Sequence, residues 1–452
     1  MSAYVIDSTL FRDQFGTEAM RRIFSDETTV QRWLDVEAAL AKVQGELGII
    51  PRAAADEIRR KARVELIDLG ALKAEMDRTA HPIVPLLRAI KRVCDGDAGE
   101  YVHWGATTQD IVDSGTVLQL RDGLEEIERD LRGLLDNLLK LAATHRDRVM
   151  VGRSHGQQAL PITFGFKVAV WAEEIRRDLQ RLDQMRERVL VGQFAGAVGT
   201  LSALGEHGIA VQEGLFRELG LGCPSIAWHV SRDSLAELAS VLAIATGSVG
   251  KIAHEIYALQ KTELGELEEP FSPGKVGSST MPHKRNPAAC ETVVALARVV
   301  RSIVPLALEG VLAEHERDKI VLQTEREYLA RLFGLSHAAI AKTRAIAAGL
   351  TVRGAHMEEN LYRQRGLLLS EAVMMRLSDA LGRQEAHEIV YRICMEVFER
   401  EGTLKEALLA DPLVGDRLSP EEIDALLDPK AYTGLAGAFV DRVTARRQDI
   451  TP

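Results

Sequence analysis

The sequence predicts an all-α protein whose long helices pack together as a bundle. Apolar residues recur at three- and four-residue steps over long stretches, and strand-like alternation is scarce. Several helical stretches are also longer than a small domain is wide, so they need partners along their whole length. The simplest arrangement is a long-helix bundle continued across subunits, and a self-contained monomeric bundle is the alternative.

Three helical patterns dominate the chain. Between 117 and 145, leucine and isoleucine recur with charged residues between them. No proline interrupts 234–269, and its apolar spacing predicts one helix of about 50 Å at about 1.5 Å per residue. A further pattern covers 288–330, where Pro305 and Gly310 are the expected kinks or breaks.

The chain length and these patterns together suggest three regions. With 452 residues, the protein has room for about two to four domains of 100–200 residues each. We expect an N-terminal helical domain at 1–110, a central long-helix bundle at 111–355 and a C-terminal helical domain at 356–452. The segment 148–151 is a short strand candidate.

Composition and charge exclude several classes of protein. Apolar residues make up 46% and charged residues 27%, which is ordinary globular composition with enough apolar surface for a sizeable core. The net charge is −10 and no Lys/Arg-rich run occurs, which argues against nucleic-acid binding but allows a local basic pocket. We therefore expect no nucleic-acid partner.

Cysteine usage and the N-terminus indicate a reduced compartment. The four cysteines are scattered without Cys-x-x-Cys spacing, so neither a disulfide framework nor structural zinc is expected. The N-terminus has no basic and apolar secretory signal, and no run of about 18 apolar residues occurs. We expect a cytoplasmic protein without a membrane partner, metal or organic cofactor, since ligand clusters and a dinucleotide fingerprint are absent from the sequence.

Three irregular segments carry residues suited to chemistry. They read His-Trp-Gly-Ala-Thr-Thr-Gln-Asp at 103–110, Gly-Arg-Ser-His-Gly-Gln-Gln at 152–158 and Gly-Ser-Ser-Thr-Met-Pro-His-Lys-Arg-Asn-Pro at 277–287. The last lies in a stretch, 270–287, of which half is Gly, Pro or Ser. Loops beyond about 12–15 residues are uncommon unless functional or disordered, so this one is expected to be a mobile flap over a site.

The side chains in these segments suit proton abstraction beside a carboxylate. Thr107, Thr108, Lys284 and Asn286 are donors for carboxylate oxygens, and His155 is a proton carrier near neutral pH. The charge that develops needs fixed donors, and water must be excluded.

Ser278 is the candidate base. A serine is a poor base unless its alkoxide is stabilised, for which Lys284, the loop N–H groups and a dry, closed site are the available means.

Each of these residues also has an ordinary structural role. Thr107 or Thr108 can cap the helix that begins near Asp110, because a threonine before a helix is more often a cap than a ligand. His155 alone would be a satisfied polar residue, and Lys284 alone a solvated charge. The hypothesis of an anion-binding site therefore rests on these residues occurring together.

Two rival functions remain open from the residues. Gly152-Arg-Ser154-His-Gly156 fits Gly-x-Ser-x-Gly, the nucleophile elbow of serine hydrolases, which needs a strand–turn–helix in an α/β sheet. The alternating strand and helix patterns of such a sheet are missing around it. The second rival is a non-catalytic structural bundle, against which the retained Ser278, Lys284 and His155 argue.

The segment 277–287 resembles the signature loop of the fumarase/aspartase superfamily, Gly-Ser-Ser-x-Met-Pro-x-Lys-x-Asn-Pro, with all fixed positions filled. The segments at 103–110 and 152–158 resemble the superfamily's other two regions in the same order and spacing. The resemblance implies reversible β-elimination of succinyl-type substrates, usually releasing fumarate. It also implies a homotetramer with a shared central bundle and sites built from three subunits.

The resemblance implies a role for each catalytic candidate. Ser278 matches the base that takes the proton next to a carboxylate, giving an aci-carboxylate, and Lys284 and Asn286 match the residues that hold it. His155 matches the general acid to the leaving group, and Glu291 the carboxylate that hydrogen-bonds this histidine.

Further positions match substrate-binding residues of the superfamily. Thr107 and Thr108 match binders of a substrate carboxylate, and His103 a substrate-contacting histidine of the adenylosuccinate-lyase-like branch. Gln157 and Arg326 complete the substrate-binding candidates. Ser154 stands where many members have threonine, which keeps the hydroxyl.

The branch within the superfamily stays open. The segments 157–165 and 194–201 are similar to 3-carboxy-cis,cis-muconate cycloisomerases, whereas His81 and the spacing before Arg326 resemble adenylosuccinate lyases. Leu322 replaces a serine that holds the nucleotide phosphate in that enzyme, and leucine cannot donate to a phosphate oxygen. We expect a non-nucleotide polycarboxylate, either a carboxymuconate or an N-substituted aspartate whose elimination gives fumarate.

Overall fold

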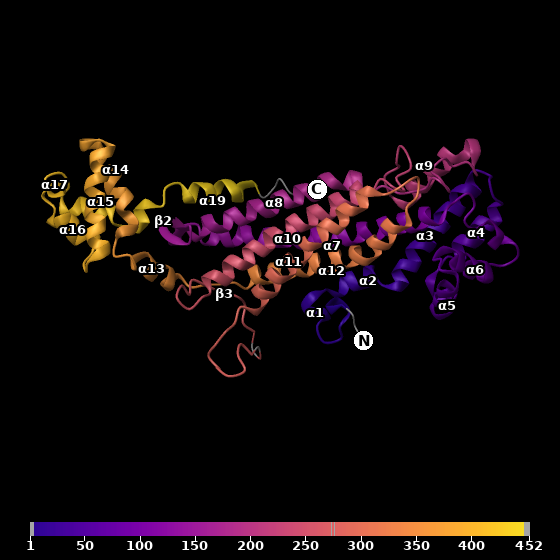
Figure 1. Ribbon diagram of the computed structural model, residues 1–452, viewed down its shortest axis with the longest axis horizontal. Coiled ribbons are helices and arrows are strands. Elements are labelled where there is room, and N and C mark those ends of the chain that lie inside the picture. The colour runs from indigo at the N-terminus through magenta and orange to yellow at the C-terminus, as the bar shows by residue number, and fades with distance from the viewer. Residues whose placement is uncertain (1–3, 273, 275, 447–452) are drawn as a thin grey trace. The chain divides into compact units, whose positions relative to one another are not determined.

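The structure, a computed structural model, describes residues 4–272, 274 and 276–446 (Figure 1). These residues form nineteen α-helices and two small two-stranded sheets, so the prediction of an all-α protein is confirmed. Contacts between residues divide the chain into two compact units. Unit 1 comprises 1–131, 178–250 and 292–341, and unit 2 comprises 132–177, 251–291 and 342–452. The predicted boundaries near 110 and 355 stay a prediction, because this division follows contacts rather than sequence order.

Besides long helices, unit 1 contains short and medium helices. They are α1 (Arg12–Phe15), α2 (Glu18–Ile23), α3 (Asp26–Glu46), α4 (Arg52–Lys61), α5 (Leu69–Thr79), α6 (Ile83–Val93) and α9 (Gly208–Leu219). Ser25 begins α3 by accepting a hydrogen bond from the Thr28 N–H, and Asp68 begins α5 by accepting one from Ala71. Helix α3 packs against α4 and α9 in this unit.

The core of unit 1 contains side chains from these helices and from the start of α7. Leu34, Ile83, Ile111 and Leu215 are fully buried in one apolar cluster. Burying each such side chain contributes about 1.5–3 kcal/mol. The cluster therefore fixes the segment that leads into α7, which carries the predicted threonines.

Five helices are long, and all but the one at 164–189 overlap the three dominant sequence patterns. They are α7 (Thr108–Thr144), α8 (Phe164–Val189), α10 (Asp233–Leu259), α11 (Ala288–Glu309) and α12 (Lys319–Ala348). The break at Gly310 is confirmed, because α11 ends there in a short 3-10 turn at Gly310–Leu312. Pro305 lies inside α11 and does not end it.

Helix α10 is shorter than its sequence pattern predicts. It ends at Leu259 instead of continuing to 269. Gly265 has a φ of +61°, a left-handed conformation that glycine adopts without strain, and the Glu266 N–H donates to the Leu259 carbonyl. The chain then forms β3 (Leu267–Glu268), which pairs with β4 (Thr351–Val352).

By length and composition, α10 is also the one described helix that could cross a membrane. Within the protein, 61% of its most apolar window is buried. A helix at the centre of a bundle has the same composition, so this finding is weak evidence for a membrane span.

Unit 2 contains a β-hairpin and a cluster of C-terminal helices. Strands β1 (Val149–Ser154) and β2 (Gln157–Thr163) pair antiparallel, which confirms the strand predicted at 148–151. The remaining helices are α13 (Gly354–Tyr362), α14 (Ser370–Leu381), α15 (Arg383–Glu399), α16 (Leu404–Ala410), α17 (Pro412–Gly415), α18 (Pro420–Leu426) and α19 (Ala436–Ala445). Helices α14 and α15 lie side by side next to α16 and α17 (Figure 1), around Val373, Leu404 and Val414.

Candidate functional site

The structure distributes the predicted site residues over both units. Unit 1 carries Thr107, Thr108, His81, His103 and Arg326, and unit 2 carries Ser278, Lys284, Asn286, His155, Gln157 and Glu291.

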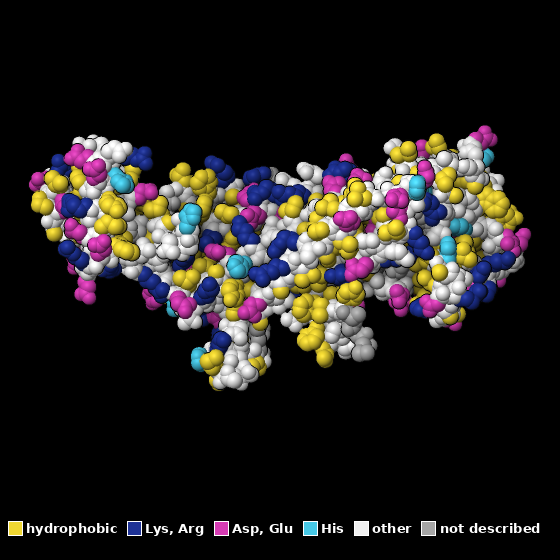
Figure 2. Space-filling model, viewed as in Figure 1, with side chains coloured by type: hydrophobic (Ala, Val, Ile, Leu, Met, Phe, Trp, Pro, Cys, Tyr) yellow, Lys and Arg dark blue, Asp and Glu magenta, His cyan; other side chains and the backbone are white. Residues whose placement is uncertain are grey.

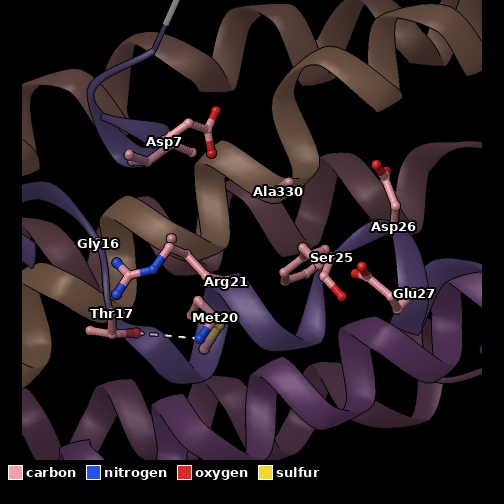
Figure 3. A pocket seen from close by; sticks show the side chains of 12 residues that line it. Asp7, Gly16, Thr17, Met20, Arg21, Ser25, Asp26, Glu27 and Ala330 are labelled. Carbon is pink, nitrogen blue, oxygen red and sulfur yellow. Dashed lines mark hydrogen bonds between the residues drawn. The ribbon is translucent and has the colours of Figure 1, made fainter. Parts of the chain in front are cut away.

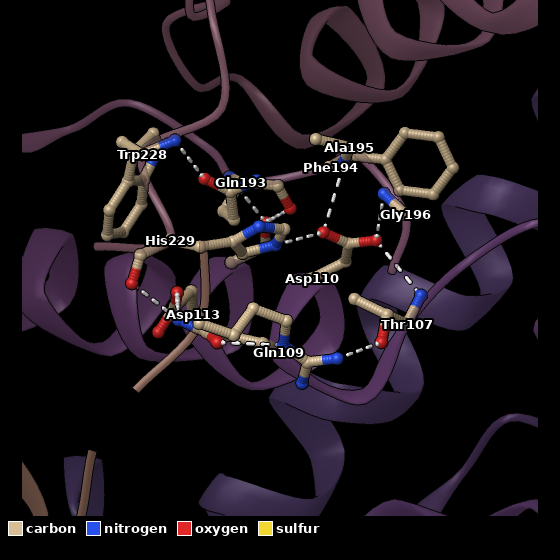
Figure 4. A network of polar contacts seen from close by, with 12 residues as sticks. Thr107, Gln109, Asp110, Asp113, Gln193, Phe194, Ala195, Gly196, Trp228 and His229 are labelled. Carbon is tan, nitrogen blue, oxygen red and sulfur yellow. Dashed lines mark hydrogen bonds and ion pairs between the residues drawn. The ribbon is translucent and has the colours of Figure 1, made fainter. Parts of the chain in front are cut away.

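The N-terminus of α7 is fastened by Asp110, a fully buried carboxylate. It accepts hydrogen bonds at 3.0 Å from the backbone N–H groups of Thr107, Ala195 and Gly196. His229 contacts the same carboxylate through Nε2 at 2.9 Å (Figure 4). A carboxylate held by this many donors fixes the position of Thr107 and Thr108 relative to the segment at 194–196.

Thr107 holds a cation instead of capping the helix with its hydroxyl. Its Oγ1 accepts a hydrogen bond from Arg317 Nη1 at 2.7 Å, and Gln109 Oε1 accepts one from Arg317 Nε at 3.3 Å. The amide of Gln109 in turn donates to Asp113 at 3.1 Å and to the His229 carbonyl at 2.8 Å. Arg317 is therefore positioned over the start of α7.

Thr108 is oriented by His81. The Val84 N–H donates to His81 Nδ1 at 3.1 Å, so the ring proton of neutral His81 is on Nε2. That nitrogen lies 3.2 Å from Thr108 Oγ1, which accepts the hydrogen bond from the Nε2–H group. The hydroxyl hydrogen of Thr108 remains available to a ligand.

The surroundings of His81 favour its neutral form. Burial, and then the positive charges of Lys319, His103 and Arg317, lower the pKa of His81. At neutral pH the ring therefore donates through Nε2 and adds no charge of its own.

A cavity of about 290 Å³ opens beside Thr108. Its lining residues are His81, Pro82, Thr108, Gln109, Val112, Arg317, Lys319, Leu322 and Arg326. The structure thus brings together three of the predicted residues, His81, Thr108 and Arg326. It adds two cations that the sequence interpretation missed, Arg317 and Lys319. Lys319, Leu322 and Arg326 follow the i, i+3, i+7 spacing of one helix face, which is the signal that could have revealed the set.

His103 does not line this cavity. Its Nδ1 donates to Glu37 Oε1 at 2.6 Å, and its backbone is left-handed with a φ of +65°. Burial would lower the pKa of His103, but the charge and hydrogen bond of Glu37, with a smaller contribution from Asp110, raise it overall. The role of His103 in substrate binding stays a prediction.

In unit 2, His155 lies at the tip of the hairpin. His155 and Gly156 are the two residues between Ser154 and Gln157, and their φ values are +52° and +77°. Two positive φ values are the requirement of a type I′ turn, in which asparagine or glycine is favoured over histidine. The side chains of His155 and Gln157 are exposed. The hairpin therefore displays the imidazole at the surface of unit 2.

Ser278 accepts hydrogen bonds from the loop's own backbone. The N–H groups of Thr280 and Met281 lie 3.3 and 3.1 Å from Ser278 Oγ. Both donors favour negative charge on this oxygen, as an oxyanion hole does. This is one of the means of alkoxide stabilisation that the sequence suggested.

The signature loop closes on itself at Gly277. A Cβ at that position would lie 2.0 Å from the Lys284 carbonyl oxygen, so only glycine permits this approach. The stretch between β3 and α11 contains no helix or strand in its described residues, and it extends away from β3 (Figure 1). Lys284 is exposed on it and Asn286 partly exposed.

Three glutamates in or next to β3 hold the base of the loop. Glu268 forms ion pairs with Arg285, at 2.8 Å, and with Arg353. Glu269 accepts hydrogen bonds from the N–H groups of Ala289 and Cys290 at 3.2 and 2.9 Å, at the N-terminus of α11. Glu266 pairs with Arg153 at 2.7 Å. These contacts tie the loop and the hairpin strand β1 to the same short strand.

Within unit 2, no hydrogen bond joins Ser278, His155 and Glu291 to one another in the described part of the chain. Glu291 is exposed on the first turn of α11. Their catalytic roles stay predictions.

The hairpin also excludes the rival nucleophile elbow. Ser154 ends β1 in an antiparallel hairpin, and no helix follows it. The elbow requires a strand–turn–helix, so the Gly-x-Ser-x-Gly match carries no hydrolase function.

A larger cavity of about 510 Å³ in unit 1 contains none of the predicted residues (Figure 3). Asp7, Asp26 and Glu27 line it, and its Arg21 is paired with Asp13 at 2.6 Å. Three carboxylates in the lining of one cavity repel a polycarboxylate ligand. Among the described residues, no group of three His, Cys, Asp or Glu side chains could hold a metal ion.

Comparison with known proteins identifies the family. Residues 12–302 match a family model described as lyase, and residues 366–443 match one described as adenylosuccinate lyase C-terminus. The chain belongs to the fumarate lyase superfamily. The predicted resemblance and the assignment as an enzyme of this superfamily are thereby confirmed.

Similar proteins extend over almost the whole chain. An N-acetyl-S-(2-succino)cysteine lyase of Enterococcus italicus is 43% identical over 99% of this chain and 98% of its own length. The crystal structure of a fumarate lyase from Mesorhizobium sp. BNC1 has a TM-score of 0.90 and 41% identity, covering 95% of this chain and 98% of that one. The crystal structure of a 3-carboxy-cis,cis-muconate lactonizing enzyme from Pseudomonas putida has a TM-score of 0.93 and 40% identity. The match covers 98% of this chain and 100% of that one.

Proposed function

We propose that this protein catalyses reversible β-elimination on a substituted succinate, with Ser278 as the base and fumarate as the unsaturated product. The observation that carries the proposal is the pair of backbone N–H groups, from Thr280 and Met281, that point at Ser278 Oγ. Without such donors a serine hydroxyl is too weakly acidic to act as a base near neutral pH.

The proposed reaction proceeds in two steps. The Ser278 alkoxide takes the proton from the carbon next to a carboxylate, and the electron pair moves into that carboxylate to form an aci-carboxylate. Lys284 and Asn286 hold its developing charge, because an ammonium and an amide N–H donate to carboxylate oxygens. The electron pair then returns to form the double bond, while the bond to the leaving group breaks and His155 supplies a proton to it.

The second substrate carboxylate is assigned to the start of α7. The Thr108 hydroxyl has its hydrogen free because Thr108 Oγ1 already accepts from His81. The N–H groups at the first turn of a 37-residue helix add a positive potential there.

A complete site requires more than one copy of the chain. His155 and Glu291 are exposed in unit 2, and Glu291 has no hydrogen bond to another described side chain that would position the imidazole. We propose a homotetramer in which partner subunits supply the missing segments, located in the cytoplasm and without membrane or nucleic-acid partners. Exposed apolar side chains on the long helices support an assembly, among them Ile244 of α10 and Val299, Leu306 and Leu308 of α11. Figure 2 shows apolar side chains among the charged ones on the face in view.

Two substrates fit this chemistry, and each has an observation in its favour. The lyase of Enterococcus italicus is named for a succinyl group carried on a thiol, which favours elimination of a heteroatom leaving group. The heteroatom can equally be nitrogen, as in an N-substituted aspartate. The structure of the lactonizing enzyme covers 98% of this chain with a TM-score of 0.93, which favours carboxymuconate cycloisomerisation as the second candidate.

The test is a direct assay in both directions. The protein is incubated with fumarate and a panel of thiols and amines, and separately with 3-carboxy-cis,cis-muconate, and ultraviolet absorbance is followed. Consumption of fumarate with one panel member supports the elimination, and turnover of carboxymuconate alone supports the second candidate. No turnover in either assay contradicts the proposal. Ser278→Ala is the matched control for background reaction.

A further inference from the structure

The cavity beside Thr108 carries an excess of positive charge. Arg317, Lys319 and Arg326 line it, and in the part of the chain that the structure describes none of the three is within ion-pairing distance of a carboxylate. Arg326 donates to the neutral Gln323 at 2.8 Å, and Arg317 to Thr107 and Gln109. Three cations that share a cavity create a positive potential there, which attracts an anionic ligand.

The nearby acids compensate these cations only in part. Asp113 and Glu325 are buried, and both are bound by Arg232, which lies 2.8 Å from Asp113 and 2.7 Å from Glu325. Two carboxylates and one guanidinium leave at most one negative charge in this buried triad, and Asp113 acts on Arg326, so the three cations remain in excess. The depressed pKa of His81, to which burial and then Lys319 contribute most, is consistent with a positive potential in the cavity.

The succinyl part of the substrate leaves these cations unused. Its two carboxylates are already assigned, one to Lys284 and Asn286 and the other to the Thr108 hydroxyl. Thr108 lines the cavity together with the cations. A substrate whose carboxylate binds Thr108 therefore places its remaining groups within reach of these cations.

The cavity also continues into a second one of about 370 Å³. The two share Pro82, Val112, Leu322 and Arg326 in their lining. Further along, the wall is formed in part by Trp33, Met76 and Leu329, which are apolar. A group bound to the cations thus has room for a small uncharged extension against this wall.

We propose that this cavity binds the leaving group, and that it selects a leaving group with its own carboxylate and without a positive charge. The inference rests on the proposed function and deepens it, since it assigns Arg317, Lys319 and Arg326 to leaving-group recognition. The substrate is then a tricarboxylate: a succinate whose substituent carries a third carboxylate, with any amine on that substituent acylated or absent.

A series of thioether substrates tests this selection. The S-(2-succinyl) adducts of 3-mercaptopropionate, 3-mercaptopropionamide and cysteamine place a carboxylate, an isosteric neutral amide and an ammonium at comparable distances from sulfur. We expect kcat/KM to be about 10- to 100-fold higher for the carboxylate than for the amide, because a charge-assisted contact is lost. The ammonium adduct should be the poorest of the three.

Lys319→Met is the informative variant, because Lys319 is exposed and its loss leaves the fold intact. It should lower kcat/KM for the carboxylate adduct and raise it for the ammonium adduct, a change of opposite sign that a general structural defect does not produce. Lys91→Met, which removes an exposed lysine of α6 outside the cavity, should change neither. Equal kcat/KM for carboxylate and amide adducts, together with an unchanged preference in Lys319→Met, would overturn the inference.

A binding measurement separates this inference from the proposed reaction. Ser278→Ala cannot remove the proton but retains the cavity, so titration calorimetry with the same adducts reports recognition alone. Tighter binding of the carboxylate adduct without turnover by the wild-type protein would support the cavity assignment and contradict the reaction. Turnover of all three adducts without a binding preference would support the reaction and contradict the cavity assignment.

Discussion

The start of α7 in unit 1 and the signature loop in unit 2 each carry a group of the proposed site residues, and the two segments are built in opposite ways. At the start of α7, the buried Asp110 carboxylate holds three backbone N–H groups and a histidine, and His81 orients the Thr108 hydroxyl. On the loop, Ser278 Oγ accepts, among the described residues, only from the N–H groups of its own turn, and Lys284 is exposed. The difference teaches that this chain preorganises the groups proposed to bind substrate. The groups proposed to move protons lie on exposed backbone, where closure over a bound substrate can complete them.

The sharpest test of this contrast is Ser278→Ala. We expect kcat to fall about a thousandfold, since the base is lost, while the melting temperature stays within about 2 °C because the loop adds little to stability. Steady-state kinetics and thermal melting measure the two effects. Ser279→Ala, at the exposed neighbouring position, is the matched control and should retain activity. Full activity of Ser278→Ala would remove this serine from the mechanism.

Asp110→Asn tests the start of α7, and we expect it to lower the stability of the fold. The amide keeps one acceptor oxygen but loses the charge that holds Thr107, Ala195, Gly196 and His229. We expect a loss of about 2–4 kcal/mol in the free energy of unfolding, measured by urea denaturation. An equal loss on replacing Asp77, an exposed partner of Lys73, would show that Asp110 has no special role.

The smallest expected effect concerns pH. Glu37 raises the pKa of His103 in the folded protein, so protonated His103 stabilises the fold below its ordinary pKa near 6.5, and this stabilisation is lost as pH rises through the raised value. Glu37→Gln should therefore lower the free energy of unfolding by about 1 kcal/mol more at pH 6 than at pH 9. Urea denaturation at both values measures it. In a His103→Gln background the pH dependence of the difference should disappear.

Most of the architecture could be predicted from the sequence because its helices are long and strongly periodic. The end of α10 could not, since no proline marks it and the reversal depends on the left-handed Gly265 and on pairing of β3 with β4. The same limit applies to the site. Ser278 and Lys284 lie in one recognisable segment, whereas the contact of His81 with Thr108 joins residues that only tertiary packing brings together.

The cations show the limit most clearly. Arg317 lies before α12 and Lys319 is its first residue, so neither belongs to a motif that names a ligand. The helical spacing places Lys319 and Arg326 on one face, but only the cavity that they share with Thr108 gives that face a common role. The general chemistry could therefore be predicted from local segments, and the leaving-group preference only from the folded chain.

The hairpin turn at His155 places activity and thermostability in conflict. Histidine occupies a left-handed position, with a φ of +52°, where asparagine or glycine would fit with less strain. Selection for heat resistance alone should favour their substitution for His155, at the cost of the proton that the proposed mechanism delivers to the leaving group. Replacing His155 would therefore relieve the backbone strain and remove the proposed proton donor in one change.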